Sequence, residues 1–98
     1  MKEILMARAS ARHILVPSAE QAEQIKLQIA EGADFAEMAR QNSTCPSGRS
    51  GGDLGEFAPG QMVKEFNDVC FNEEVGVVHG PVQTQFGYHL IEVTERTD

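Results

Sequence analysis

The sequence predicts a single α+β domain in which helices cover a small sheet. A chain of 98 residues is long enough for one compact core. Its composition of 41% apolar and 23% charged residues is typical of a globular protein. Local patterns follow the order strand, helix, helix, strand, helix, strand, strand, and no repeat or linker interrupts them. We therefore expect residues 1–98 to form one domain.

The first third of the chain predicts a strand followed by a helix. An apolar run at residues 12–16 stops at a proline, as a short strand does. Ser18 with Gln21 has the spacing of a capping box, and apolar residues then recur at three- and four-residue intervals up to Gly32. These signals predict a helix over residues 19–31 that ends at the glycine.

The middle of the chain predicts a second helix, a loop and a short strand. Asp34 with Glu37 repeats the helix-start signal, and the second helix is expected to end near Asn42. Residues 43–53 are rich in Ser, Gly and Pro, which predicts a loop of a length that is often functional. An alternating pattern at residues 54–57 predicts the strand.

The last third of the chain predicts one more helix and two strands. Residues 63–71 carry apolar side chains at helical spacing. Residues 76–81 predict a short bent strand, and the alternation at residues 88–93 predicts the strand that closes the sheet. Residues 95–98 are expected to fray, as chain ends commonly do.

Charge and composition exclude several classes of function. Eight Lys and Arg against fifteen Asp and Glu give a net charge of −7, which disfavours nucleic acid and anionic membranes as partners. The apolar run at residues 4–7 is too short for a signal sequence or a membrane span, so we expect a cytoplasmic protein. Two cysteines do not form a disulfide framework, and the histidines and cysteines lack metal-ligand spacing. No metal or cofactor is expected.

Two of the three histidines lie within strand patterns. His13 precedes an apolar triplet, and His89 belongs to the last alternating run, so both side chains could point into the interior. They are either two separate core histidines with satisfied hydrogen bonds or a pair on neighbouring strands that bond to each other. His79 has no such companion and is expected to be structural or exposed.

The two cysteines lie in different environments. Cys45 lies in the Ser- and Gly-rich loop, where a thiol is more often exposed, whereas Cys70 lies on the apolar face of a helix and is expected in the core. A thiol hydrolase or redox enzyme would need Cys45 to ionise readily, and Arg49 is the one positive charge nearby in sequence. The chain shows none of the local signatures of thiol hydrolases, so this interpretation is disfavoured.

Four apolar residues could either fill the core or form a binding pocket. A methionine and aromatic rings suit the flat apolar ring of proline, because the methionine side chain is adaptable and the aromatic faces are flat. Spacing alone does not decide between the two roles. The four residues are Leu54, Met62, Phe66 and Phe86.

Five motifs together resemble the parvulin family of peptidyl-prolyl cis–trans isomerases, especially its small bacterial single-domain members. The resemblance covers residues 11–94 and implies a four-stranded antiparallel sheet with the order β-α-α-α-β-α-β-β. The additional short helical turn would lie within residues 43–53. The motifs are HILV at residues 13–16, SxCPSGxxGGDLGEF at 43–57, GQM at 60–62, GPV at 80–82 and QFGYHLI at 85–91.

The resemblance also implies which residues form the site. It places His13 and His89 face to face beneath the site, with Thr84 in their hydrogen-bond network and Cys45 at the family's cysteine or aspartate position. The residues that it implies for the proline pocket are Met62, Phe66 and Phe86, with Leu54 at the rim.

By resemblance, the expected function is rotation of Xaa-Pro peptide bonds in peptides and unfolded proteins, which assists protein folding. We expect a non-covalent mechanism, since members with aspartate in place of the cysteine are also isomerases. Phosphate-directed members carry basic residues after the first strand, and residues 17–20 here contain none, so unphosphorylated substrates are expected. The alternative is a non-catalytic, chaperone-like module that holds peptides in the same cleft. A monomer is expected in either case.

Overall fold

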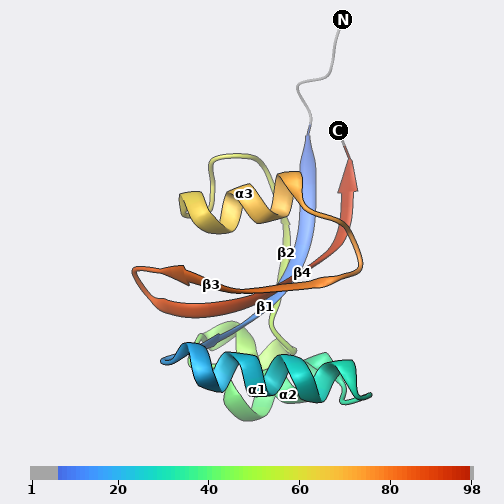
Figure 1. Cartoon of the computed structure of the whole chain (residues 1–98). Coiled ribbons are helices and arrows are strands. Elements are labelled where there is room, and N and C mark those ends of the chain that lie inside the picture. Colours follow the sequence, from blue (N-terminus) through green and yellow to red (C-terminus); the bar gives the residue numbers. More distant parts are fainter. Residues whose placement is uncertain (1–6, 98) are drawn as a thin grey trace, which may run out of the picture.

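A computed structural model describes residues 7–97 of the chain (Figure 1). Four strands, three α-helices and one 3-10 helix follow one another in the order β-α-α-η-β-α-β-β, so the predicted α+β class and element order are confirmed. The 3-10 helix lies within the Ser- and Gly-rich loop, where the resemblance implies a helical turn. The elements are β1 (Arg8–Val16), α1 (Ala19–Ala30), α2 (Phe35–Asn42), η2 (Pro46–Ser50), β2 (Asp53–Phe57), α3 (Lys64–Asn72), β3 (Val78–Thr84) and β4 (Gly87–Thr97).

The four strands form one antiparallel sheet with the order β2-β1-β4-β3. The two long strands β1 and β4 lie at the centre and pair along their whole lengths, with a register shift after Ser10. Because β1 and β4 come from opposite ends of the chain, the sheet brings the N-terminal and C-terminal motifs together.

Helices cover both faces of this sheet. In Figure 1, α3 lies on one side of the strands, and α1 and α2 lie on the other. Side chains alternate between the faces along each strand. In β1, Ala9 and Ala11 belong to the core beneath α3, and Ile14 and Val16 belong to the core beneath α1 and α2. His13 lies two residues after Ala11 in the strand, so its side chain points to the same face, the one covered by α3.

The ends of three strands differ from the sequence-based predictions. Strand β1 begins at Arg8 and β4 continues to Thr97, because these ends pair with each other, so the prediction that the chain frays from residue 95 is wrong for residues 95–97. Strand β3 spans Val78–Thr84 instead of residues 76–81, since it follows its partner β4 up to the turn. The apolar run at residues 4–7 lies, apart from its last residue, outside the described part of the chain.

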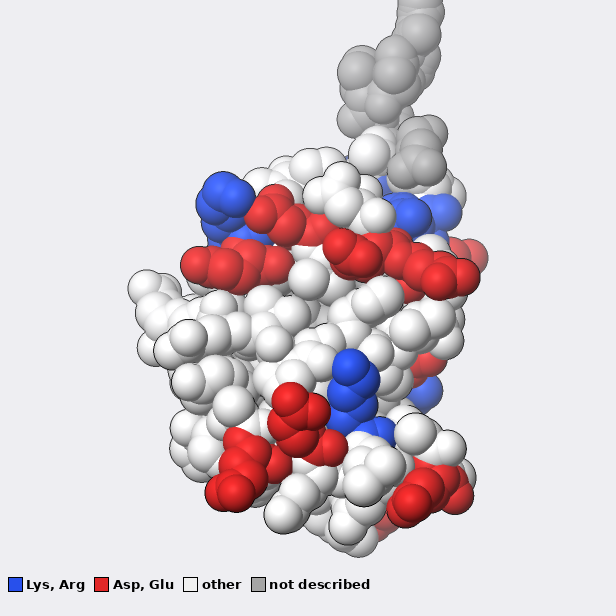
Figure 2. All heavy atoms as spheres, viewed as in Figure 1, with Lys and Arg blue, Asp and Glu red and all other residues white. Residues whose placement is uncertain are grey.

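The surface reflects the acidic composition. On the face shown in Figure 2, acidic side chains gather over α3 with the neighbouring strand ends and again over α1, and the band between them carries little charge. No helix within residues 7–97 is long and apolar enough to cross a membrane.

Candidate functional site

Two imidazoles face each other on the α3 side of the sheet. His13 comes from β1 and His89 from β4, and their Nδ1 atoms lie 3.0 Å apart. The rings are nearly parallel and meet at their Nδ1 edges, with centroids 5.1 Å apart and planes 18° from parallel. Only 5% of His13 and 4% of His89 is exposed. The sequence left open whether these histidines pair, and the structure brings them together.

Both imidazoles are neutral at pH 7. Burial, with a smaller contribution from the charge of His89, lowers the pKa of His13 from 6.5 to about 4. Burial also lowers the pKa of His89. Since the Nδ1 atoms face each other, one ring donates its N–H and the other accepts with a bare nitrogen. A neutral pair satisfies this requirement.

A continuous series of hydrogen bonds runs through the pair. The Ser47 hydroxyl donates to Cys45 Sγ at 3.2 Å, and Ser47 Oγ lies 3.1 Å from His13 Nε2. At the other end, Thr84 Oγ1 lies 2.8 Å from His89 Nε2 and accepts from the Phe86 N–H at 3.1 Å. Within residues 7–97 no buried side-chain polar atom lacks a partner.

The donor at Ser47 fixes one direction for the whole series. With the Ser47 hydroxyl as the donor to sulfur, the oxygen of Ser47 accepts from the Nε2–H of His13. His13 Nδ1 is then bare and accepts from the Nδ1–H of His89, whose Nε2 accepts from the Thr84 hydroxyl. The series therefore runs from the Phe86 amide to the Cys45 thiol with one hydrogen for each bond.

The loop that carries Cys45 and Ser47 is held against β1. Thr44 N donates to Leu15 O at 2.7 Å, and His13 N donates to Gly52 O at 3.0 Å. Gly52 has a φ of +85°, and a Cβ atom at this position would lie 2.2 Å from the carbonyl oxygen of His13. The close approach of the loop to the histidine strand therefore requires glycine.

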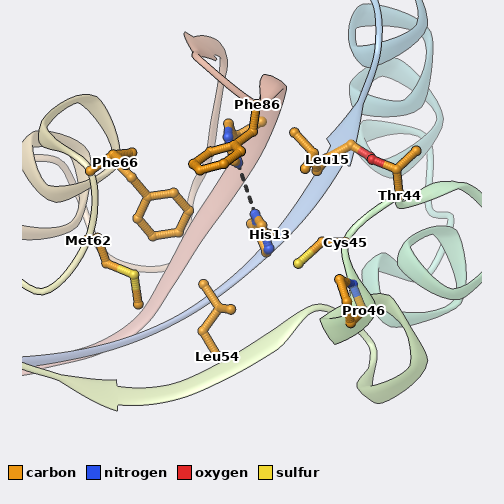
Figure 3. A pocket seen from close by; sticks show the side chains of 11 residues that line it. His13, Leu15, Thr44, Cys45, Pro46, Leu54, Met62, Phe66 and Phe86 are labelled. Carbon is orange, nitrogen blue, oxygen red and sulfur yellow. Dashed lines mark hydrogen bonds between the residues drawn. The ribbon is translucent and has the colours of Figure 1, made fainter.

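An apolar pocket of about 400 Å³ opens above the imidazole pair (Figure 3). Met62 and Phe66 form one side, Cys45 and Pro46 the opposite side, and His13 lies at the base between them. The lining residues come from every strand except β3, from the segments around α3 and η2, and from the turn between β3 and β4. They are His13, Leu15, Thr44, Cys45, Pro46, Leu54, Met62, Val63, Phe66, Phe86 and His89.

Two phenylalanines contribute to the pocket in different ways. Phe66 is only 3% exposed, and its ring contacts both imidazoles edge-to-face, with centroid distances of 5.4 Å to His13 and 5.6 Å to His89. Phe86, in the turn between β3 and β4, is 61% exposed. Phe66 is thus part of the core as well as of the pocket, whereas Phe86 is free to contact a ligand.

The predicted site residues all lie together here, either in the pocket or in the hydrogen-bond series. The predicted core position of Cys70 is confirmed, because this thiol is fully buried and burial raises its pKa to about 12. His79 lies apart from the pair, and its Nε2 is 2.7 Å from Glu74 O, as expected for a structural histidine. No group of side chains within residues 7–97 is arranged to hold a metal ion.

Several residues of the pocket and of the hydrogen-bond series were not predicted. Ser47 links the imidazole pair to Cys45, and the signal available in the sequence was its place two residues after a candidate cysteine. Leu15 could have been found from its strand parity with His13. Thr44, Pro46 and Val63 reach the pocket through loop geometry that the sequence pattern does not specify.

Comparison with known proteins identifies the family. The sequence matches the PPIC-type PPIase domain over residues 2–97. The chain belongs to this family. The foldase protein PrsA of Geobacillus sp. (strain WCH70) is 49% identical over 89 residues, which are 90% of this chain and 32% of that protein. This PPIC-type domain spans about a third of the length of the curated relatives that it matches.

Solved structures share the fold over nearly the whole domain. A crystal structure of the peptidylprolyl isomerase PrsA from Bacillus anthracis superposes with a TM-score of 0.91 at 38% identity, covering 96% of this chain and 44% of that one. NmPin, the parvulin of Nitrosopumilus maritimus, gives a TM-score of 0.81 at 35% identity, covering 90% of this chain and 96% of that one. The predicted parvulin fold and the assignment to the PPIC-type PPIase family are confirmed.

Proposed function

We propose that this PPIC-type domain accelerates cis–trans rotation of Xaa-Pro bonds in unphosphorylated peptides and unfolded proteins by non-covalent means. The observation that carries the proposal is the apolar pocket of about 400 Å³ directly above a neutral, buried imidazole pair. A proline ring fits such a pocket, because the pocket is lined by apolar side chains and closed below by the imidazole pair.

The pocket can favour the twisted amide without breaking a bond. Rotation of a prolyl bond has a barrier of about 20 kcal/mol, and a ten-thousandfold acceleration requires a reduction of about 5 to 6 kcal/mol. When the amide twists it loses resonance, so its carbonyl oxygen carries less negative charge than in the planar state. An environment that excludes water therefore disfavours the planar amide more than the twisted one.

The histidines contribute to shape and electrostatics rather than proton transfer. Each of the five bonds of the series from Phe86 to Cys45 is formed by one hydrogen, and both nitrogens of each imidazole have a partner within the series. An imidazolium would be disfavoured in this buried position, as the lowered pKa of His13 indicates. We therefore assign His13, His89 and Thr84 the role of a rigid base beneath the rotating bond.

Replacing Cys45 by aspartate tests the non-covalent mechanism. The Ser47 hydroxyl that donates to Cys45 Sγ can donate equally to a carboxylate oxygen, so the Cys45→Asp variant keeps the hydrogen-bond series and should retain substantial activity. Cys45→Ala removes the acceptor and serves as the matched comparison. Complete loss of exchange in a folded Cys45→Asp variant would establish an obligate nucleophile and overturn the proposal.

The short connection between β1 and α1 supports the choice of unphosphorylated substrates. Strand β1 ends at Val16 and α1 begins at Ala19, so two residues without positive charge connect them. The decisive assay measures cis–trans exchange by NMR on Ala-Xaa-Pro-Phe peptides, with a phosphoserine among the Xaa residues and Met62→Ala as the control. Exchange that rises only with phosphoserine would contradict this part of the proposal.

A peptide-holding module is the second candidate, and the exposure of Phe86 favours it. A ring that is 61% exposed beside an apolar pocket can bind an extended apolar segment without accelerating its cis–trans isomerisation. Binding of the same peptides without exchange, in protein shown to be folded, would select this function. The cytoplasmic location and the monomeric state stay predictions, and sedimentation velocity tests the second of them.

A further inference from the structure

A second cleft, polar and positively charged, adjoins the proline pocket on its Cys45 side. It has a volume of about 370 Å³ and shares Thr44, Cys45 and Pro46 with the proline pocket. In Figure 3 these three residues form the side of the pocket opposite Met62 and Phe66. The remaining lining residues of the second cleft are Arg40, Ser43, Gly48 and Arg49.

The charge of this cleft is opposite to that of the chain. The protein carries eight Lys and Arg against fifteen Asp and Glu, yet two of the eight basic residues line the cleft and no acidic residue does. Arg40 comes from the last turn of α2, and Arg49 comes from η2. Two arginines converge here because the loop that carries Cys45 folds back on α2.

The two arginines differ in how far they are already engaged. Arg40 Nη1 donates to Glu37 Oε1 at 3.0 Å, which uses one of its five N–H groups. Within residues 7–97, Arg49 has no ion-pair partner, whereas Arg12 and Lys64 each bond an acidic residue. With Glu37 offsetting Arg40, the cleft holds about one uncompensated positive charge.

We propose that this cleft is a specificity subsite for a carboxylate side chain of the substrate, an Asp or Glu close to the proline. The inference rests on the proposed isomerase function, because it uses the proline ring to anchor the peptide in the adjoining pocket. Because the two cavities share Thr44, Cys45 and Pro46, a residue close to a proline bound in the pocket lies within reach of the cleft. One uncompensated guanidinium matches a singly charged carboxylate rather than a phosphate dianion.

Matched Glu and Gln peptides test the subsite, because the two side chains differ in charge and hardly in size. Glu or Gln is placed two residues before, one before, one after or two after the proline, and kcat/KM is measured by NMR exchange. At one position the Glu/Gln ratio should be about two- to fivefold at low salt, as for an exposed ion pair, and should decline with added NaCl. Arg49→Gln should bring that ratio to about one, and Arg40→Gln should lower it.

Lys64→Gln is the control, because Lys64 bonds Asp68 on α3 outside the cleft and its loss should leave the ratio unchanged. A Glu/Gln ratio of one or less at all four positions, or a ratio that Arg49→Gln leaves intact, overturns the subsite. A phosphoserine peptide that gains more than the Glu peptide overturns the assignment to a carboxylate. If the protein accelerates exchange in neutral peptides but shows equal kcat/KM for the Glu and Gln peptides, the subsite is refuted and the isomerase function is not.

Failure of the proposed function is distinguished by a second readout. If the protein accelerates exchange in no peptide, the isomerase proposal fails. The subsite can still be tested by titrating the protein with the Glu and Gln peptides and following the NMR shifts of the Arg40 and Arg49 Nε–H signals. Shifts with the Glu peptide that are absent with the Gln peptide support it, and identical shifts with both peptides refute it.

Discussion

Acidification should destabilise this domain through its buried imidazole pair. The pKa of His13 is about 4 in the folded protein and about 6.5 in an unfolded chain. Between these values the unfolded state binds more protons than the folded state, so stability falls as the pH falls. At pH 4.5 the expected loss from His13 alone is about 2 to 3 kcal/mol relative to pH 7. The loss levels off below about pH 4, where the folded protein also binds the proton.

Urea unfolding followed by circular dichroism at pH 7, 6, 5 and 4.5 measures this loss. Carboxylates also titrate in this range, so the quantity of interest is the difference between the wild type and His13→Asn. Asn keeps a polar group toward His89 but does not titrate. His79→Gln serves as the control, since His79 lies outside the pair. A His13→Asn protein whose stability fell with pH as steeply as the wild type would refute the reasoning.

Two further predictions distinguish residues that bind the substrate from residues that maintain the fold. Phe66→Ala should cost about 3 to 5 kcal/mol of stability because the ring is buried. Phe86→Ala should cost about 0.5 kcal/mol or less, because the ring is exposed, and still lower kcat/KM about tenfold. Urea unfolding measures the stabilities and NMR exchange measures kcat/KM; equal stability losses for the two variants would contradict the assignment of Phe66 to the core and Phe86 to the pocket alone. Gly52→Ala should lower the free energy of unfolding by more than about 3 kcal/mol, because its Cβ would collide with the His13 carbonyl oxygen. Gly60 has a similar φ of +89° but open space around it, so Gly60→Ala should lower the free energy of unfolding by only about 1 to 2 kcal/mol. Similar losses for the two glycine variants would show that backbone strain rather than the collision decides.

Local signals in the sequence predicted the elements because each signal is a physical contact in the fold. The predicted cap of α1 is present as a hydrogen bond from Gln21 N to Ser18 Oγ at 3.1 Å. The predicted cap of α2 is present as a bond from Glu37 N to Asp34 Oδ2 at 3.0 Å. Such contacts span three residues, so they are visible in sequence. Strand ends were less predictable, because Arg8 is held by a partner at the far end of the chain.

The site was predictable where strand parity or a family motif constrained it. The alternation of side chains along β1 and β4 determines which face of the sheet His13 and His89 point to, so it could be predicted that they share a face. Ser47 joins His13 across 34 positions, and this bond depends on how η2 packs against β1. The second cleft likewise depends on the same loop, since Arg40 and Arg49 approach each other through tertiary structure alone.

A single physical condition underlies both the state of the histidines and the proposed catalysis. The exclusion of water that lowers the pKa of His13 also disfavours the polar, planar form of a prolyl amide bound above it. Phe66 contributes to both effects, because its ring contacts the two imidazoles and lines the pocket. A substitution that admits water here should raise the pKa of His13 and slow rotation together. The pKa of His13, followed by NMR titration across pocket variants, therefore reports how dry the environment of the rotating bond is.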